Sequence, residues 1–440
     1  PAQGLKSSKY QCLSSATWNL VLEMTEFRPF SAYIVAAGRS AGGKKNGKLS
    51  GWHPADMCAK VIDGLIEKVG VDGKAVDDVI IGCVSQIGAQ AGNIGRTVVL
   101  SSKKLPESVP GTSVDRQCGS GQQALHFAAQ AVMSGSQDCV IAAGVENMSM
   151  VPIGSNIIDG LKNKRGLPIG EYAVETYGED MKQLEEFGMP TSMFSQFGGA
   201  ELLARKYKMT KEELDTFGAL SQERGAAATK AGRFKEEIIP LPVKSSKGGS
   251  SDEMHTVDEG LRKTTYESVS KLKPMFQNGM LTPATSSQIC DGAAAVMLCN
   301  ENGLKKLGLK PRAKITALSV VGSDPVIMLE GPVPATGAVL EKAGLKPSDI
   351  DVVEVNEAFA PVPLAVAKVH FGGSLDKINV NGGAMAIGHP LGCTGVKLMT
   401  TLLHELEKRQ GKYGLLSICE GGGTANATII ERVGGPASKL

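Results

Sequence analysis

The pattern of apolar and polar positions contains the same series of segments twice along the chain. An amphipathic stretch, Leu65–Gly70, is followed by a turn and by the apolar run Asp78–Gly82. Far downstream, the amphipathic stretch Leu340–Leu345 is followed by a turn and by the run Asp351–Val355. Each copy therefore predicts an amphipathic helix, a turn and a buried strand.

A second pair of segments extends the repeat. In the first copy, Cys118 precedes a helical pattern, and the apolar run Cys139–Gly144 comes next. In the second copy, a glycine-rich loop after Asn381 leads to a helical pattern at about 395–409 and to the run Leu415–Cys419. The repetition predicts an α/β fold with two related halves, whose strands are covered by helices on both sides.

The spacer from about Pro152 to Phe276 differs from both copies, because it is richer in Lys, Glu and Met. Its helical stretches, 198–206 and 211–231, suggest an insertion folded over the first half, and the segments 42–48 and 247–251 are predicted to be exposed loops. The expected division is an N-terminal extension 1–27, a first half 28–151 and 277–305, a loop domain 152–276, a second half 306–434, and a tail 435–440.

Composition narrows the class of protein. The chain has 440 residues, which suits two or three domains, and its 47 basic and 45 acidic residues argue against a nucleic-acid surface. No apolar run reaches the roughly 18–20 residues of a membrane span. The first 27 residues lack the layout of a signal peptide. The 9 cysteines show no CxxC spacing, which favours a reducing compartment over a disulfide framework or a zinc site.

Cys118 is the first candidate for chemistry. An extended β-branched piece precedes it, and small residues and a helical pattern follow it. Backbone N–H groups at a helix N-terminus favour a thiolate and can bind a developing oxyanion, which predicts a nucleophile. The alternative is a small buried cysteine of the core. We expect that structural role for Cys12, Cys58, Cys83, Cys139, Cys290, Cys299 and Cys393.

Two further glycine-rich turns carry candidate acids and bases. His389 lies in Gly388–Gly392 and could accept the proton of Cys118, although a histidine bonded to backbone in a tight loop is the alternative. Cys419 ends a buried strand and runs, after Glu420, into three glycines; here the alternative is a strand-end cysteine beside a flexible turn. Gly421 offers a backbone N–H to an oxyanion.

The segment Asn356–Phe359 follows the predicted strand of the second copy. Read alone, it is more typical of a helix N-terminus with an asparagine cap. In the functional interpretation, the Asn356 amide positions a water molecule or a carbonyl group.

These motifs resemble the thiolase family, acyl-CoA C-acyltransferases that cleave or join 3-ketoacyl-CoA. The resemblance covers about Arg28 to Arg432 and rests on four motifs in the family's order: Cys118, Asn356–Phe359, Gly388–Pro390 and Cys419–Gly423. It implies a doubly repeated α/β/α/β/α fold with an inserted loop domain. It also implies a homodimer or homotetramer, with coenzyme A (CoA) and acyl-CoA as substrates and with no metal or cofactor.

The resemblance further implies the role of each residue. Cys118 would accept the acyl group, His389 would activate it, and Cys419 would exchange the proton on the α-carbon of acetyl-CoA. One oxyanion site would be formed by His389 and a water held by Asn356, and the other by the backbone N–H groups of Cys118 and Gly421. On the CoA side, Ser287 and Arg262 resemble binding residues of the family.

Three departures from the family's patterns bear on these roles. Thr285–Ser287 stands where many members have Asn-Ala-Ser, so only Ser287 matches the family at this site. Glu420 replaces a common apolar residue. The His-Asp-Cys-Phe box of the sterol-carrier-linked branch is absent, because Asn356–Phe359 occupies its place.

Four functions are compared. The expected one is a degradative 3-ketoacyl-CoA thiolase, and a biosynthetic acetoacetyl-CoA thiolase is the alternative in the other direction. A ketoacyl-synthase condensing enzyme is disfavoured by Cys419 and Asn356. An inactive acyl-CoA or lipid carrier is disfavoured by the intact Cys118 and His389, although fold alone never fixes function. Chain-length preference depends on the shape around 193–199, which the sequence does not show.

The last three residues, Ser438-Lys439-Leu440, match a peroxisomal import signal. They predict import into a peroxisome or a related, glycosome-like organelle through the import receptor. The N-terminal import signal that many peroxisomal thiolases use is missing, so the C-terminal tripeptide would serve instead.

Overall fold

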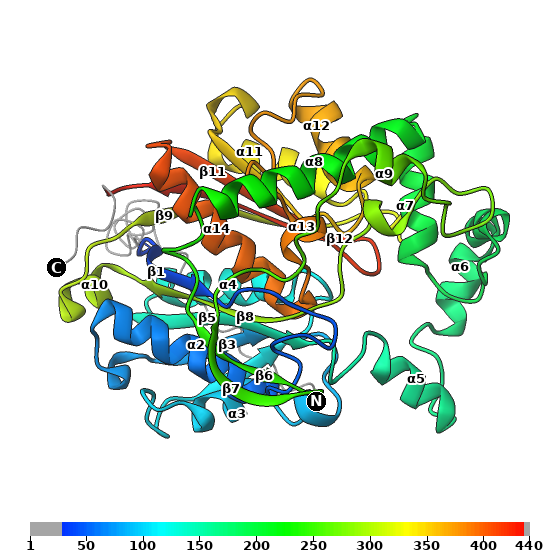
Figure 1. Cartoon of the computed structure of the whole chain (residues 1–440). Helices are drawn as coiled ribbons and strands as arrows, with labels where there is room; N and C mark the ends of the chain where they lie inside the picture. Colours follow the sequence, from blue (N-terminus) through cyan, green and yellow to red (C-terminus); the bar gives the residue numbers. More distant parts are fainter. Residues whose placement is uncertain (1–28, 435–440) are drawn as a thin grey trace, which may run out of the picture.

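The computed structural model describes residues 29–434 (Figure 1). The predicted extension 1–27, Cys12 and the Ser438–Leu440 signal lie outside the described residues. The first half contains β1 (Tyr33–Arg39), β2 (Gly43–Lys44), α2 (Pro54–Val69), β3 (Asp78–Gly82), α3 (Ile94–Ser101), β4 (Gly111–Val114), α4 (Ser120–Met133), β5 (Cys139–Asn147), β8 (Cys290–Cys299) and α10 (Glu301–Leu307).

The second half repeats this order of elements. It contains β9 (Ala313–Gly322), α11 (Pro332–Ala343), β10 (Val352–Val355), α12 (Pro361–His370), α13 (Ala384–Ile387), α14 (Thr394–Lys408), β11 (Tyr413–Glu420) and β12 (Thr424–Arg432). Local sequence explains the helix ends. Helix α2 begins with a proline and ends at Gly70, whose φ of 75° suits a left-handed cap, and α11 likewise begins with a proline and ends at Gly344 with φ 65°.

The two halves have the same strand order. In the first half it is β4-β3-β5-β8-β1, and in the second it is β10-β11-β12-β9. The β3–β5 and β10–β11 pairs are parallel, whereas β8 and β12 run antiparallel to their neighbours. Strands β1 and β9 pair only through Tyr33–Ile34 and Ala313–Lys314, so the two halves share one continuous sheet with a narrow seam.

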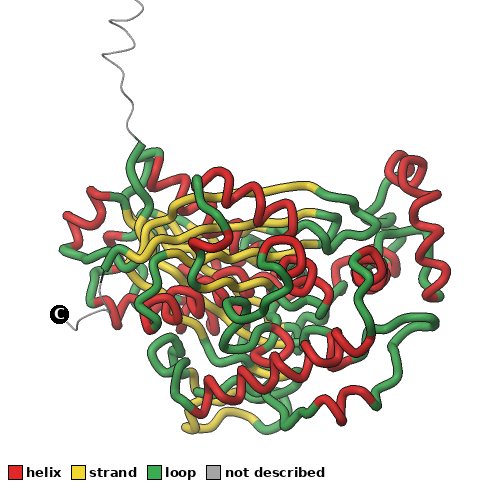
Figure 2. Tube along the Cα trace, turned by 90° about the horizontal axis from the view of Figure 1, so that it is seen from above, coloured by secondary structure: helices red, strands yellow, loops and turns green. Residues whose placement is uncertain are grey.

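Helices on both faces of the strands create five layers (Figures 1 and 2). Helices α2 and α3 cover the outer face of the first half, and α11 and α12 cover that of the second. Helices α4 and α14 lie between the two sets of strands and are buried over most of their length. The predicted five-layer arrangement of two similar α/β halves is therefore confirmed.

The insertion between β5 and β8 supplies the loop domain. Its elements are α5 (Ser155–Lys162), α6 (Glu171–Met181), α7 (Gln196–Lys206), α8 (Lys211–Lys230), β6 (Leu241–Ser245), β7 (Gly249–His255) and α9 (Tyr266–Ser270). Helix α8 crosses the second half, whereas α5 and α6 lie away from the strands (Figure 1). No helix between residues 29 and 434 is long and apolar enough to cross a membrane.

The two predictions of exposed loops are confirmed only in part. Residues 246–248 form the exposed turn of the antiparallel hairpin of β6 and β7, but residues 249–251 belong to strand β7. Within 42–48, Gly43–Lys44 is a short strand that pairs with β8, and Gly42 and Gly43 are buried. A Cβ on Gly42 would meet the carbonyl oxygen of Ile387 at 2.7 Å, so close backbone approach, rather than exposure, explains this glycine.

The central helices approach each other through glycines at their N-termini. A Cβ on Gly395 would lie under 3.0 Å from the backbone of Gln122, and one on Gly121 would lie 2.7 Å from the carbonyl oxygen of Gly392. Backbone atoms cannot move aside as a flexible side chain can. The absence of a side chain here therefore lets the first turns of α4 and α14 come into contact.

This packing predicts that Gly395→Ala destabilises the fold, because its methyl group has no space beside the backbone of α4. The free energy of unfolding should fall by about 1–3 kcal/mol, as measured by chemical denaturation. Gly337→Ala in α11 is the matched control. There the nearest atom to a new Cβ is 3.5 Å away, and removing a helical glycine should stabilise by up to about 1 kcal/mol. Equal stability of the two variants would contradict the proposed close contact.

Candidate active site

The two candidate turns occupy equivalent places in the two halves. Cys118 lies between β4 and α4, two residues before the helix begins. His389 lies before α14. The segment that leads to it makes a parallel bridge between Ile378 and Val353 of β10, at the place where β4 pairs with β3 in the first half. Because α4 and α14 meet at their N-termini, the fold brings both turns to the same end of the central layer.

A tight turn presents the Cys118 thiol. Gln117 has φ 48°, and the Ser120 hydroxyl accepts from the N–H of Arg116 and donates to the carbonyl of Gln117. The thiol is buried, and the Gln196 amide of α7 lies 3.9 Å from its sulfur. Burial raises the pKa of the Cys118 thiol to about 12, and the contact with Gln196 opposes this only in part. Burial therefore outweighs the expected effect of the helix N-terminus, and the resting thiol is protonated.

His389 is held as a neutral imidazole. The Thr394 hydroxyl donates to the carbonyl of Pro390 at 2.9 Å, so it accepts from Nδ1 of His389, which lies 2.6 Å away. This assigns the ring proton to Nδ1 and leaves the lone pair on Nε2. Burial, followed by the charge of Lys397, lowers the pKa of His389 to about 3. The imidazole can therefore accept a proton at neutral pH.

Asn356 lies beside the histidine. Its amide nitrogen is 3.5 Å from Nε2 of His389, and its side chain slightly opposes the rise that burial causes in the pKa of Cys419. Helix α12 begins only at Pro361, so Asn356 does not cap a helix. Its amide oxygen is buried and has no partner among residues 29–434, which suits a water molecule or ligand that donates a hydrogen bond.

Cys419 is the last residue but one of strand β11 (Tyr413–Glu420), just before the three glycines. Burial raises its pKa well above the ordinary value for a thiol, and negative charge on Cys118 or Glu420 raises it further. At neutral pH Cys419 carries its proton and can serve as an acid.

Glu420 packs the second glycine-rich turn against the first. A Cβ on Gly119 would overlap the Glu420 carboxyl group, and one on Gly421 would lie 3.0 Å from Oε1 of Gln117. The structure thus places Gly421 beside the Cys118 turn, where its N–H was expected. Burial raises the pKa of Glu420 to about 7, although the Thr424 hydroxyl donates to its carboxylate at 2.6 Å.

The two residues expected to bind CoA, Ser287 and Arg262, lie near each other on both sides of Gln288. The backbone N–H of Ser287 donates to the carbonyl of Ala358 at 2.9 Å, and its side chain is half-buried. Arg262 is exposed; its backbone N–H donates to Gln222 at 2.8 Å, and its guanidinium lies 3.4 Å from Oε1 of Gln288. Arg262 also lines a cavity of about 550 Å³ between α8 and residues 262–266.

Sequence patterns missed several residues that shape the site. Gln196 belongs to the loop domain and is part of no motif, so only the fold could show its contact with Cys118. Thr394 follows the Gly388–Gly392 turn by a few residues, and its spacing from His389 was a signal that could have been used. Within the described part of the chain, no group of three or more His, Cys, Asp or Glu side chains is arranged to hold a metal ion.

Comparisons with known proteins agree with this geometry. The family model "Thiolase, N-terminal domain" matches residues 32–302, and "Thiolase, C-terminal domain" matches residues 309–432. The chain is 48% identical to a steroid 3-ketoacyl-CoA thiolase of Mycobacterium tuberculosis over 91% of this chain and 94% of that protein. It is 39% identical to a 3-ketoacyl-CoA thiolase of Psychrobacter sp. over 93% of this chain and the whole of that one.

Solved structures give the same result. The acetyl-CoA acetyltransferase of Bacillus anthracis superposes with a TM-score of 0.81 at 34% identity, covering 92% of this chain and 100% of its own. Human mitochondrial 3-ketoacyl-CoA thiolase superposes with a TM-score of 0.78 at 35% identity, covering 92% of this chain and 99% of its own.

The raised pKa of Glu420 predicts a change in stability with pH. Between pH 5 and about 7 the native state keeps a proton that the unfolded chain has released, and by pH 8 it has lost that proton too. Wild-type stability therefore falls as pH rises from 5 to 8. In Glu420→Gln this loss is absent. The free energy of unfolding of the variant, relative to wild type, should rise by about 2–3 kcal/mol between pH 5 and 8. Denaturation at several pH values tests this, and parallel pH profiles would show that Glu420 ionises normally.

Proposed function

Because the chain belongs to the thiolase family, we propose that its site cleaves 3-ketoacyl-CoA with CoA into acetyl-CoA and a shortened acyl-CoA. The chain is thus an acyltransferase in which CoA is a substrate, and the family uses no cofactor. The observation that carries the proposal is the meeting of the three turns. The Cys118 turn packs through Gly119 against Glu420, next to Cys419, and the first turn of α4 contacts Gly392, beside His389. Two protonated thiols and a neutral imidazole are the groups that this reaction needs.

The first half of the reaction uses all three groups. Cys118 attacks the β-keto carbonyl while Nε2 of His389 takes its proton, and the carbon–carbon bond then breaks to leave acyl-Cys118. The released enolate of acetyl-CoA takes the proton of Cys419. The backbone N–H groups of Cys118 and Gly421 would stabilise one oxyanion, and His389 with a water on Asn356 would stabilise the other.

The second half restores the site. The thiol of a fresh CoA gives its proton to the Cys419 thiolate and attacks the acyl-Cys118 thioester. The Cys118 thiolate leaves and takes back its proton from the imidazolium of His389. Protons and bonds balance without a metal or a redox cofactor. Because one thioester replaces another, the same groups also catalyse the biosynthetic direction, and substrate supply decides between them.

We further propose that the preferred acyl groups are large and apolar. Phe197 follows Gln196, which contacts Cys118, and Phe359 ends the box that holds Asn356. The Phe197 ring lies 5.3 Å from the rings of both Phe276 and Phe359, and 44% of Phe197 is exposed. This aromatic wall beside the nucleophile suits a long or ring-bearing chain, as the name of the mycobacterial relative also suggests.

Assembly and location complete the proposal. We propose a homodimer or homotetramer, in keeping with the family, to be measured by light scattering on the purified protein. We also propose import into a peroxisome or a related organelle through the receptor that recognises Ser438-Lys439-Leu440. A fluorescent protein that carries this C-terminus, compared with one that lacks the tripeptide, measures the import.

Removing either reactive thiol should abolish turnover. In Cys118→Ala the acyl acceptor is lost, and in Cys419→Ala the enolate loses its acid; each change should lower kcat by about 10²–10⁴-fold or more. The assay follows CoA-dependent loss of 3-ketoacyl absorbance. Cys299→Ala is the control, because this thiol is buried in β8 in the core under α2. Full turnover of Cys118→Ala would assign the nucleophile elsewhere.

Phe197→Ala tests the preference for large acyl groups. It should lower kcat/KM for long-chain or ring-bearing 3-ketoacyl-CoA by about tenfold or more, because apolar contact with the chain is lost. For acetoacetyl-CoA, whose acyl group is too short to use this contact, kcat/KM should stay within about threefold. A wild-type enzyme that cleaves only acetoacetyl-CoA would refute the preference.

A further inference from the structure

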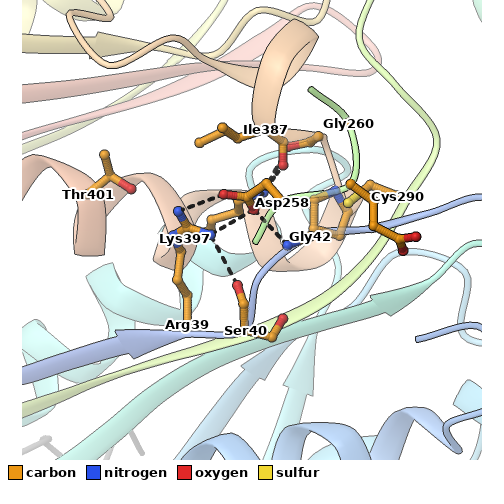
Figure 3. Close-up of polar contacts among 12 residues, drawn as sticks. Arg39, Ser40, Gly42, Asp258, Gly260, Cys290, Ile387, Lys397 and Thr401 are labelled. Carbon is orange, nitrogen blue, oxygen red and sulfur yellow. Dashed lines mark hydrogen bonds and ion pairs between the residues drawn. The ribbon is translucent and has the colours of Figure 1, made fainter. Parts of the chain in front are cut away.

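A buried lysine lies directly behind the turn that carries His389. Lys397 is on α14, and only 2% of its side chain is exposed. Its ammonium donates to the carbonyl of Ile387 (Figure 3). It also donates to the carbonyl of Gly388 at 3.2 Å. It has no place in the reaction described above. A buried ammonium is costly, so a lysine here needs a compensating role.

The turn depends on donors from α14. Gly388 has φ 87° and ψ 159°, a conformation open to glycine, and a Cβ there would meet the Cys290 sulfur at 2.5 Å. One helical turn before Lys397, the Thr394 hydroxyl donates to the carbonyl of Pro390 and accepts from Nδ1 of His389. Thr394 and Lys397 therefore hold the carbonyls on both sides of His389 from one face of one helix.

Buried carboxylates balance the charge of Lys397. The Asp258 carboxylate lies 3.9 Å from its ammonium and accepts a two-pronged contact from Arg39 at 2.9 and 3.1 Å. Arg39 also contacts Glu237 at 2.7 Å, which accepts from the Thr401 hydroxyl at 2.9 Å. Two buried cations thus face two buried anions. The cluster is neutral overall but places the positive charge of Lys397 on the side of His389.

The same cluster reaches the segment that carries Arg262. Asp258 opens that segment, and its carboxylate accepts from the N–H of Gly42 at 2.6 Å. Two residues on, the carbonyl of Gly260 accepts from Gln288 at 2.7 Å, and a Cβ on Gly260 would meet the carbonyl of Ala386 at 2.5 Å. The loop behind the cavity and the turn before His389 are therefore packed backbone to backbone.

We propose that Lys397 is a positioning residue for the thiolytic reaction: its ammonium fixes the carbonyls of Ile387 and Gly388 and so sets the direction of the His389 imidazole. The proposal rests on the function proposed above and adds a residue to it. Asp258 and Arg39 act through Lys397, because they hold its ammonium in place. None of the three touches a reacting atom in this scheme.

The charge of Lys397 also acts on the histidine. Together with burial, it lowers the pKa of His389, so removing the charge should raise that pKa. The acid side of the kcat/KM profile, where the base becomes protonated, should then move to higher pH. Other titratable groups line this part of the site: Cys118 near α4, Cys419 and Glu420 on β11, Cys290 on β8, Glu146 on β5, and Asp258 behind Lys397.

Lys397→Met keeps the length of the side chain and removes the ammonium. We expect kcat/KM for 3-ketoacyl-CoA to fall about 10²-fold, as for a catalytic group that is misplaced by about 1 Å, and the acid limb to move to higher pH. Lys397→Arg, which restores charge and donors, should recover activity to within about tenfold of wild type. Lys408→Met, at the exposed end of the same helix, should leave both measurements unchanged.

Alkylation of Cys118 by iodoacetamide gives a second readout that needs no turnover. Its rate depends on transfer of the thiol proton to His389, so it should fall in Lys397→Met and recover in Lys397→Arg. If Lys397→Met does not fold, as judged by circular dichroism, Lys397→Gln replaces it, because it keeps a donor but loses the charge; the same shift in pH is expected.

The outcomes separate the two proposals. A wild-type protein without thiolytic activity would overturn the proposed function, while the alkylation series would still report on Lys397. An active wild type whose Lys397→Met variant folds and keeps its kcat/KM, pH profile and alkylation rate would overturn the role of Lys397. A loss that Lys397→Arg fails to rescue, with an unchanged pH profile, would also overturn it, since that result indicates packing alone.

Discussion

The contact between the first turns of α4 and α14 determines everything else at the site. Each helix begins directly after a turn that holds a reactive side chain, Cys118 in one half and His389 in the other. Glycines let the two backbones touch, and Glu146 ties the ends of β3 and β5 to the N–H of Gly392 at 2.9 Å. Because both turns lead into helices whose backbones are in contact, the thiol and the base are held in a fixed position relative to each other.

Burial determines the charge states of the two thiols and of the imidazole. Both thiols keep their protons, and the imidazole stays neutral, because a charge inside the central layer is not solvated. A reaction in such a site starts from uncharged groups. Ions form only while substrate is bound, when Cys118 gives its proton to His389 and Cys419 gives its proton to the enolate. Close to the histidine, the charge of Lys397 is compensated by the buried Asp258, which also binds Arg39.

The sequence predicted the fold well where it repeats. The runs Asp78–Gly82 and Asp351–Val355 were expected to be strands, and they lie in β3 and β10 at equivalent positions. The spacing of apolar residues within one segment indicates which of its positions are buried, so such strands can be predicted from the sequence alone. The hairpin of β6 and β7 was missed because the glycines and serines at 248–251 show no alternation of apolar and polar residues. Only the pairing with β6 makes residues 249–251 part of a strand.

Candidate residues were predictable to the extent that they sit on turns with distinctive chemistry. Cys118, His389 and Cys419 stood out for that reason. The sequence around Asn356 resembled a helix cap, but in the structure α12 begins only at Pro361. Gln196 and Lys397 could not be found in this way. The first reaches the site from another domain, and the second is one lysine in an amphipathic helix whose burial only the tertiary structure reveals.

The narrow seam between β1 and β9 also sets the order in which the chain can fold as it is synthesised. Strand β1 emerges early, but its partners β8 and β9 follow only after the whole loop domain. Until then its edges stay unpaired, and the central layer lacks α14. Such long-range pairing is slow and leaves unpaired strand edges exposed, so we expect the nascent chain to be most prone to aggregation before the second half has left the ribosome.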